Sequence, residues 1–197
     1  MSAEKKPTEK RPITLNGVFE ISSVDAYKKI EVVDGDWSQA DVHFYRGHGM
    51  LSGVIHGNLL YCFSAFMKEN PIGRAYAGSV GFVMEGNRDN IQLMRRTDVS
   101  FVLKEHVPTE NRDEPYYRAP DLAVEVVYRD FADDMFQRID DFLSHGTEQV
   151  WVVAPSPKII WVYAQDGTAK AYRSGDTLSG GDLLPSFELD IAKVFET

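Results

Sequence analysis

Residues 120–127 read Pro-Asp-Leu-Ala-Val-Glu-Val-Val, and this stretch decides the fold. It is apolar almost throughout, which is typical of a central β-strand covered on both faces. Its one interruption is Glu125, and a buried carboxylate needs a cation, a metal or a path to solvent to offset the cost of burial. From the residues alone, a structural salt bridge and a metal site both remain open for Glu125.

The segments that follow predict a strand–helix–strand unit. A helix is expected over residues 130–144, and strands are expected over 149–153 and 159–164. The apolar side chains of the helix recur at spacings of three and four: Met135, Phe136, Ile139, Phe142 and Leu143. This order of elements indicates a right-handed crossover within a mixed sheet.

The segments before residue 120 predict further strands and one long helix. Apolar residues at helical spacing favour an amphipathic helix over 51–68, packed on the sheet. Strands are expected over 30–33, 80–84, 91–94 and 99–103. The strands over 80–84 and 91–94 are expected to form a hairpin. Residues 104–120 are expected to be a long surface loop. The predicted fold class is therefore α/β, with a mixed central β-sheet flanked by helices and with additional antiparallel hairpins.

Composition and charge limit the class of protein. The 197 residues fit one domain, which we expect over residues 13–197, after a flexible Lys- and Glu-rich tail over 1–12 that lacks the apolar core of a signal peptide. A net charge of −9 argues against a non-specific nucleic-acid coat, but it does not exclude a local basic groove. The single cysteine, Cys62, excludes an intrachain disulfide framework. We expect a cytoplasmic protein without a membrane partner.

Two aspartates are candidate partners for Glu125. Asp121 points to the same face of the strand, but at about 3.3 Å per residue it lies roughly 13 Å away, too far to share one cation. Asp98 stands just before the strand expected over 99–103, so it can meet Glu125 from a neighbouring strand, although a simple cap or loop role is equally open. His48 and His56 have no metal-ligand spacing and are interpreted as capping or solvent-facing residues.

The order of several motifs resembles a known family. Asp98-Val99-Ser100-Phe101-Val102 and then residues 120–127 are similar to the Uma-type family of restriction-endonuclease-like proteins, in the PD-(D/E)XK nuclease superfamily. The later stretches Gly146-Thr147-Glu148-Gln149-Val150-Trp151-Val152-Val153 and Gly175-Asp176-Thr177-Leu178 are also similar, and the resemblance runs over about residues 31–195. It implies a restriction-endonuclease-like sheet.

The resemblance also implies a site. Glu31, Asp98 and Glu125 match the family's three acids, which hold Mg²⁺ or Mn²⁺, and the backbone carbonyl of Val126 can be a further ligand. Such a metal lowers the pKa of an attacking water and stabilises charge on the phosphate. The implied activity is metal-dependent hydrolysis of phosphodiester bonds, with DNA as the expected substrate.

The chain departs from the family at the catalytic lysine. The family pattern Asp-x-x-x-Lys is matched by Asp134-Met135-Phe136-Gln137-Arg138, so Arg138 replaces the lysine. Arginine can contact the scissile phosphate but cannot deprotonate water. The alternative for Arg138 is an i,i+4 ion pair with Asp134 on the helix surface.

Two functions therefore stay open at the level of sequence. The three acids favour a Mg²⁺-dependent endonuclease, for which a homodimer would suit the cutting of two strands. Arg138 and the acidic net charge favour a catalytically degenerate relative that acts as a nucleic-acid-binding or protein-interaction module.

Overall fold

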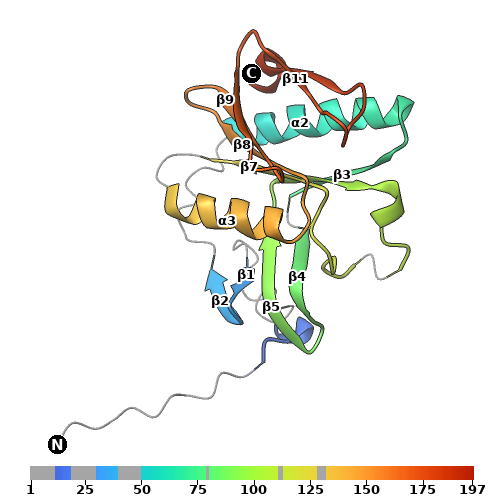
Figure 1. Ribbon diagram of the computed structural model, residues 1–197, viewed down its shortest axis with the longest axis vertical. Helices are drawn as coiled ribbons and strands as arrows, with labels where there is room; N and C mark the ends of the chain where they lie inside the picture. The colour runs from blue at the N-terminus through green and yellow to red at the C-terminus, as the bar shows by residue number, and fades with distance from the viewer. Residues whose placement is uncertain (1–11, 19–29, 40–49, 79, 111–112, 128–131) are drawn as a thin grey trace, which may run out of the picture.

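The computed structural model describes residues 12–18, 30–39, 50–78, 80–110, 113–127 and 132–197. The tail expected over 1–12 lies outside this range except for Pro12, and so does His48. Among the described residues, the strands form a six-stranded sheet, a four-stranded sheet and a small two-stranded one (Figure 1).

The six-stranded sheet has the order β10-β9-β8-β7-β6-β3. Its centre is β7 (Leu122–Val126), which pairs in parallel with β8 (Gln149–Ala154). The other pairs are antiparallel and bring in β9 (Ile159–Ala164), β10 (Ala169–Arg173), β6 (Val99–Leu103) and β3 (Gly73–Ala77). The sheet is thus mixed, as predicted, and α3 (Ala132–Ser144) connects the two parallel strands.

Two helices cover opposite faces of this sheet, with α2 (Met50–Glu69) on one side and α3 on the other (Figure 1). Side chains alternate along β7, so Leu122, Val124 and Val126 pack with the α2 residues Ile55, Leu59 and Phe63. Ala123 packs with the α3 residues Met135, Ile139 and Phe142. The same alternation places Glu125 on the α3 face of β7.

Helix α2 is also covered from its other side by the C-terminal segment. This segment comprises β11 (Thr177–Ser179), β12 (Glu188–Asp190) and α4 (Ile191–Val194), and the ring of Phe187 stacks on that of Phe63 with centroids 5.2 Å apart. By length and composition alone α2 could cross a membrane. Its fully buried Ile55, Leu59 and Phe63 are those of a core helix.

The four-stranded antiparallel sheet has the order β2-β1-β5-β4. It comprises β1 (Ile30–Val33), β2 (Asp36–Gln39), β4 (Gly81–Asn87) and β5 (Asn90–Arg96). The predicted turn between β1 and β2 is Asp34-Gly35, with positive φ angles of 52° and 67° that suit a tight hairpin. Only Thr97 and Asp98 separate β5 from β6, so Asp98 lies where the chain passes from this sheet into the larger one.

The predicted strands and helices within the described residues are confirmed, and the structure adds five strands. These additions are β2, β3, β10, β11 and β12. The hairpin of β4 and β5 is longer than predicted, and the loop over 104–120 begins with a 3₁₀ turn, Lys104–His106.

Candidate functional site

The site centres on an ion pair between β7 and α3. The Arg138 side chain is 1% exposed and Glu125 is fully buried. Arg138 Nη2 donates a hydrogen bond to Glu125 Oε1 at 2.9 Å. Of the two interpretations of Glu125 left open by the sequence, the structure shows the salt bridge. The surface ion pair of Arg138 with Asp134 is not what holds this arginine, because its side chain points into the protein.

A second carboxylate reaches the same guanidinium from the four-stranded sheet. Arg138 Nη1 donates to Glu31 Oε2 at 2.5 Å, although the two residues are 107 apart in sequence. Glu31 Oε1 also accepts the backbone N–H of Arg96 at 2.8 Å, and the Arg96 carbonyl accepts from Arg138 Nη2 at 2.6 Å. Arg138 therefore bridges Glu31 and Glu125 and ties the two sheets together.

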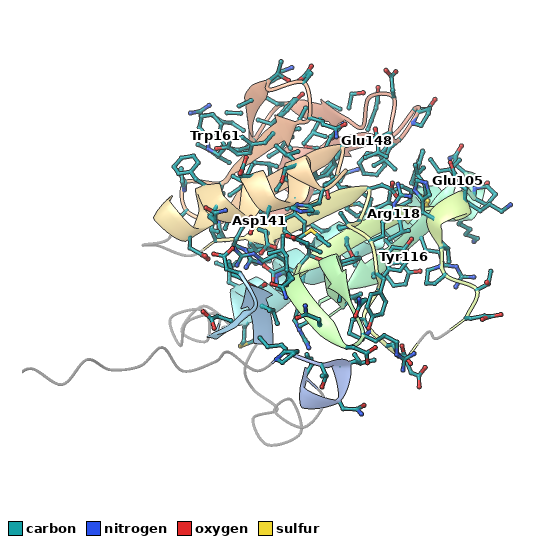
Figure 2. All side chains as sticks on the ribbon, turned by 60° about the horizontal axis from the view of Figure 1, so that its bottom comes forward. Glu105, Tyr116, Arg118, Asp141, Glu148 and Trp161 are labelled. Atoms are coloured by element: carbon teal, nitrogen blue, oxygen red, sulfur yellow. The ribbon has the colours of Figure 1, made fainter. Side chains whose placement is uncertain are left out.

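A second arginine extends this network. Arg95 on β5 is 2% exposed, and its Nη1 lies 2.9 Å from Glu31 Oε2. Its Nε and Nη2 contact Asp141 Oδ2 at 2.8 and 2.7 Å, and its Nη1 lies 3.9 Å from Asp134 Oδ1. Figure 2 shows Asp141 on the side of α3 that faces the four-stranded sheet. We call Glu31, Glu125, Arg95, Arg138 and Asp141 the arginine-bridged cluster.

Sequence reasoning missed Arg95 and Asp141, although both carry a signal. Asp134, Arg138 and Asp141 recur at i, i+4 and i+7, so they follow one face of α3. Arg95 continues the alternation of the buried residues Ile91 and Leu93 along β5. A charged residue at a position where a strand points inward predicts a buried partner.

The arginines decide the charge state of Glu31. Burial alone would raise the pKa of this carboxyl group, but the nearby Arg138 and Arg95 guanidinium groups outweigh burial and lower its pKa to about 2. Burial likewise opposes the charge on Arg138, yet Glu125 and Glu31 hold the pKa of its guanidinium well above the ordinary value. The cluster therefore sets three carboxylates against two guanidinium groups, which offset most of their charge.

Asp98 lies beside this cluster, in the link between β5 and β6. Val99 pairs with Val124, so Asp98 comes opposite Glu125 one step further along the two strands. Its Oδ2 accepts the backbone N–H of Val126 at 2.8 Å. His56 Nε2, from α2, lies 3.8 Å from the same oxygen, which places near the site a residue that the sequence suggested was capping or solvent-facing.

Asp121 has a separate role at the start of β7, as its distance from Glu125 predicts. It is 2% exposed, and its Oδ2 accepts the backbone N–H of Leu103 at 2.7 Å. Its Oδ1 lies 2.8 Å from His106 Nδ1. These contacts fasten the loop after β6 to the strand that carries Glu125.

The donor types of the site suit Mg²⁺ or Mn²⁺, but their arrangement does not. Glu31, Asp98 and Glu125 offer the hard oxygen ligands that these ions prefer. Among the residues that the structure describes, however, no three His, Cys, Asp or Glu side chains are grouped so that they could hold one ion. The guanidinium of Arg138 lies between Glu31 and Glu125, at the position that a shared metal would need.

Two comparisons relate the chain to known proteins. Residues 26–192 match the model of the Uma2 family, whose description is "Putative restriction endonuclease". The fold is similar to a crystal structure described as that of a putative nuclease belonging to DUF820 from Anabaena variabilis, with a TM-score of 0.70 and 18% sequence identity over 93% of this chain and 98% of that one. No curated protein matches the sequence significantly.

Proposed function

Because this chain belongs to the Uma2 family, we propose that it is an endonuclease that hydrolyses phosphodiester bonds in DNA. The observation that supports this best is the meeting of Glu31 and Glu125 on one buried arginine, with Asp98 next to them. These are the three acids that the family resemblance implies, and they lie where the two sheets join: Glu31 on β1, Glu125 on β7 and Asp98 in the link between β5 and β6.

The proposal includes Mg²⁺ or Mn²⁺. The ion would bind only if it displaced the Arg138 guanidinium from its place between Glu31 and Glu125. Glu31, Asp98, Glu125 and the carbonyl of Val126 would hold the ion, which would lower the pKa of an attacking water. Exchange is required because Arg138 makes three polar contacts in the metal's place. A displaced Arg138 would offer a positive charge that could pair with an oxygen of the scissile phosphate.

A second candidate function follows if this exchange does not occur. The protein would then be a catalytically inactive relative that binds nucleic acid or a protein partner. The bridge itself favours this candidate, since Arg138 already pairs with both carboxylates, and so does the net charge of −9. A homodimer and a cytoplasmic location remain predictions under either candidate.

Nicking of supercoiled plasmid DNA tests the proposal. The wild type should convert plasmid to the nicked form in Mn²⁺ and not with a chelator. Glu125→Ala should abolish the activity, since it removes a ligand. Arg138→Lys should keep or raise activity, because it restores the lysine of the family pattern and weakens the two-carboxylate bridge.

The comparison of these variants separates the two candidates. A wild type no more active than Glu125→Ala would contradict the endonuclease proposal. Activity in Arg138→Lys alone would mean that the scaffold is intact and that the arginine has switched it off.

A further inference from the structure

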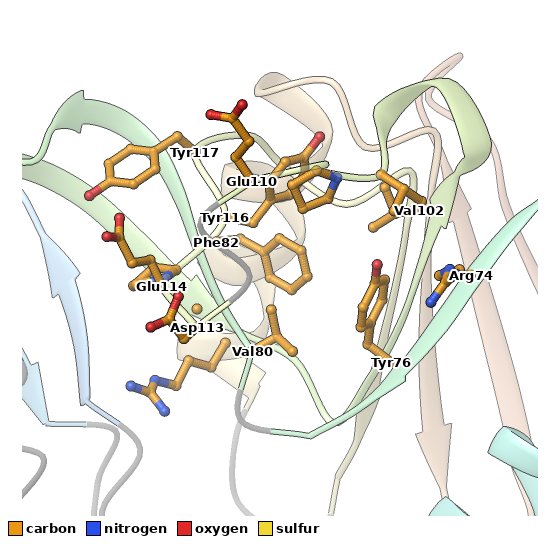
Figure 3. A pocket seen from close by; sticks show the side chains of 15 residues that line it. Arg74, Tyr76, Val80, Phe82, Val102, Glu110, Asp113, Glu114, Tyr116 and Tyr117 are labelled. Carbon is orange, nitrogen blue, oxygen red and sulfur yellow. The ribbon is translucent and has the colours of Figure 1, made fainter.

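A pocket of about 520 Å³ lies beside the arginine-bridged cluster, and it plays no part in the site described above. Its lining comes from β3, from β4, from the end of β5, from β6 and from the loop that follows β6. Figure 3 shows Tyr76 on one side of the pocket, and Phe82 and Val80 on the other. The lining includes four aromatic side chains and two arginines, Arg74 and Arg96.

Arg96 connects this pocket to the cluster directly. Its backbone N–H donates to Glu31, and its carbonyl accepts from Arg138. Its side chain lines the pocket. A molecule in the pocket can therefore contact a residue whose backbone is hydrogen-bonded to both Glu31 and Arg138, so the pocket adjoins the cluster through Arg96.

The aromatic wall of the pocket is fixed in place. Phe82 is 1% exposed, and Tyr116 meets its ring edge-on, with centroids 6.2 Å apart and an interplanar angle of 80°. The Tyr116 backbone N–H donates to the Gly81 carbonyl, and its carbonyl accepts from the Val83 N–H, each at 2.7 Å. The Tyr116 hydroxyl group donates to the carbonyl of His106. The wall is thus formed before a ligand arrives.

We propose that this pocket binds one unstacked nucleobase of the DNA on which the neighbouring site acts. The proposal rests on the proposed function for the identity of the polymer. Aromatic walls suit a planar base, because every base has a π-face that stacks on such rings. Enzymes that work on an unstacked nucleotide read its edge by hydrogen bonds inside a pocket of this kind.

The charges in the pocket favour a base over a phosphate. Three carboxylates, Glu110, Asp113 and Glu114, line it together with the two arginines, so the formal charge of the lining is negative. Carboxylates repel a phosphate but accept hydrogen bonds from amino groups of bases such as cytosine. Arg74 is exposed, so it is free to approach the sugar–phosphate chain outside the pocket.

Binding of a short single-stranded DNA that contains 2-aminopurine tests the inference in metal-free buffer. The fluorescence of this base analogue should fall on binding to the wild type, as it does when the base stacks on an aromatic ring. A DNA of the same length made only of abasic residues should bind more weakly. Tyr76→Ala should weaken binding of the base-containing DNA about 5- to 150-fold, the range for loss of one stacking ring. Tyr76→Phe, which keeps the ring, is the matched control and should bind like the wild type.

Three results would overturn the inference. One is equal binding of the abasic and base-containing DNA, and another is unchanged affinity in Tyr76→Ala. The third is displacement of the DNA by tetramethylammonium but not by free nucleosides, which would identify a cage for cations. Should Tyr76→Ala fail to fold, the fluorescence of the wild type and the abasic comparison still decide the question.

The binding assay requires no cleavage, so its outcome is separable from that of the nicking assay. Plasmid nicking with base-independent binding would leave the proposed function standing without this pocket. Base-dependent binding without nicking would support the pocket and assign the protein to the non-cleaving candidate.

Discussion

Replacement of Arg138 with methionine should destabilise the protein strongly, because it removes the one group that bridges Glu31 and Glu125. Methionine keeps most of the apolar stem and loses the charge. Glu31 would retain Arg95, whose Nη1 lies 2.9 Å from it, whereas Glu125 is fully buried and would lose its 2.9 Å contact with Arg138.

The size of the effect follows from the burial of the pair. Removal of one partner from a buried ion pair costs about 3–5 kcal/mol in the free energy of unfolding, since the remaining charge is left without compensation. For a chain of this length, that loss lowers the melting temperature by about 6–20 °C. Arg138→Lys should cost less, because it retains the charge but not the two-pronged geometry of the guanidinium.

Urea denaturation at neutral pH, followed by circular dichroism, measures this loss. Arg173→Met is the control, since Arg173 is exposed and its replacement should change the free energy of unfolding by less than about 0.5 kcal/mol. The double variant Arg138→Met/Glu125→Gln should be more stable than the sum of the single effects predicts, with a coupling of about 0.5–3 kcal/mol. Additive effects, or a loss below about 1 kcal/mol in Arg138→Met, would refute the bridge.

Three further predictions follow from the same cluster. The pKa of Glu31 is lowered from 4.5 to about 2, so its ionised form contributes about 3 kcal/mol of stability. This contribution is complete above about pH 4.5 and is lost as the pH falls to about 2. Urea denaturation at pH 7 and pH 3 should therefore show a smaller decrease in the free energy of unfolding for Glu31→Gln than for the wild type. Asp141→Asn should destabilise by about 1–3 kcal/mol in thermal denaturation, because it weakens a charged partner of Arg95, while the same change at the exposed neighbour Asp140 should have little effect. Millimolar Mn²⁺ should raise the melting temperature of Arg138→Met more than that of the wild type, since the ion no longer competes with the arginine. An equal shift in both proteins would contradict the displacement of Arg138 by the metal.

The sequence predicts best those strands that are buried on both faces. The strands β7 and β8 are short and almost entirely apolar, and a short apolar run predicts a buried strand. The five strands that were missed, β2, β3, β10, β11 and β12, are all at the edge of a sheet. Edge strands have one free side and tolerate polar residues, as in the Asp-Trp-Ser-Gln of β2, so their pairing depends on a neighbour rather than on their own pattern.

The sequence predicted three members of the arginine-bridged cluster, Glu31, Glu125 and Arg138, but not their contacts with one another. A carboxylate inside an apolar strand predicts that Glu125 has a partner, and helical spacing limits what lies on the face of α3. Neither pattern shows that Arg138 reaches Glu31, because that contact joins residues 107 apart and exists only once both sheets are formed. Local spacing instead suggested Asp134, which in the structure lies 3.9 Å from Arg95.

The charges at the junction of the sheets limit what this site can do without a metal. Four buried carboxylates, Glu31, Asp98, Glu125 and Asp141, stand against two buried guanidinium groups, so the described groups carry a formal excess of two negative charges. A DNA phosphate would be repelled by that excess, whereas a divalent cation would cancel it, even though Arg138 now fills the central position. Direct contact of DNA with the cluster should therefore depend on Mg²⁺ or Mn²⁺, while base binding in the pocket next to Arg96 should not. A protein that only binds nucleic acid would have to bind it through the pocket and its rim. In such a protein the carboxylates would serve only to join the two sheets.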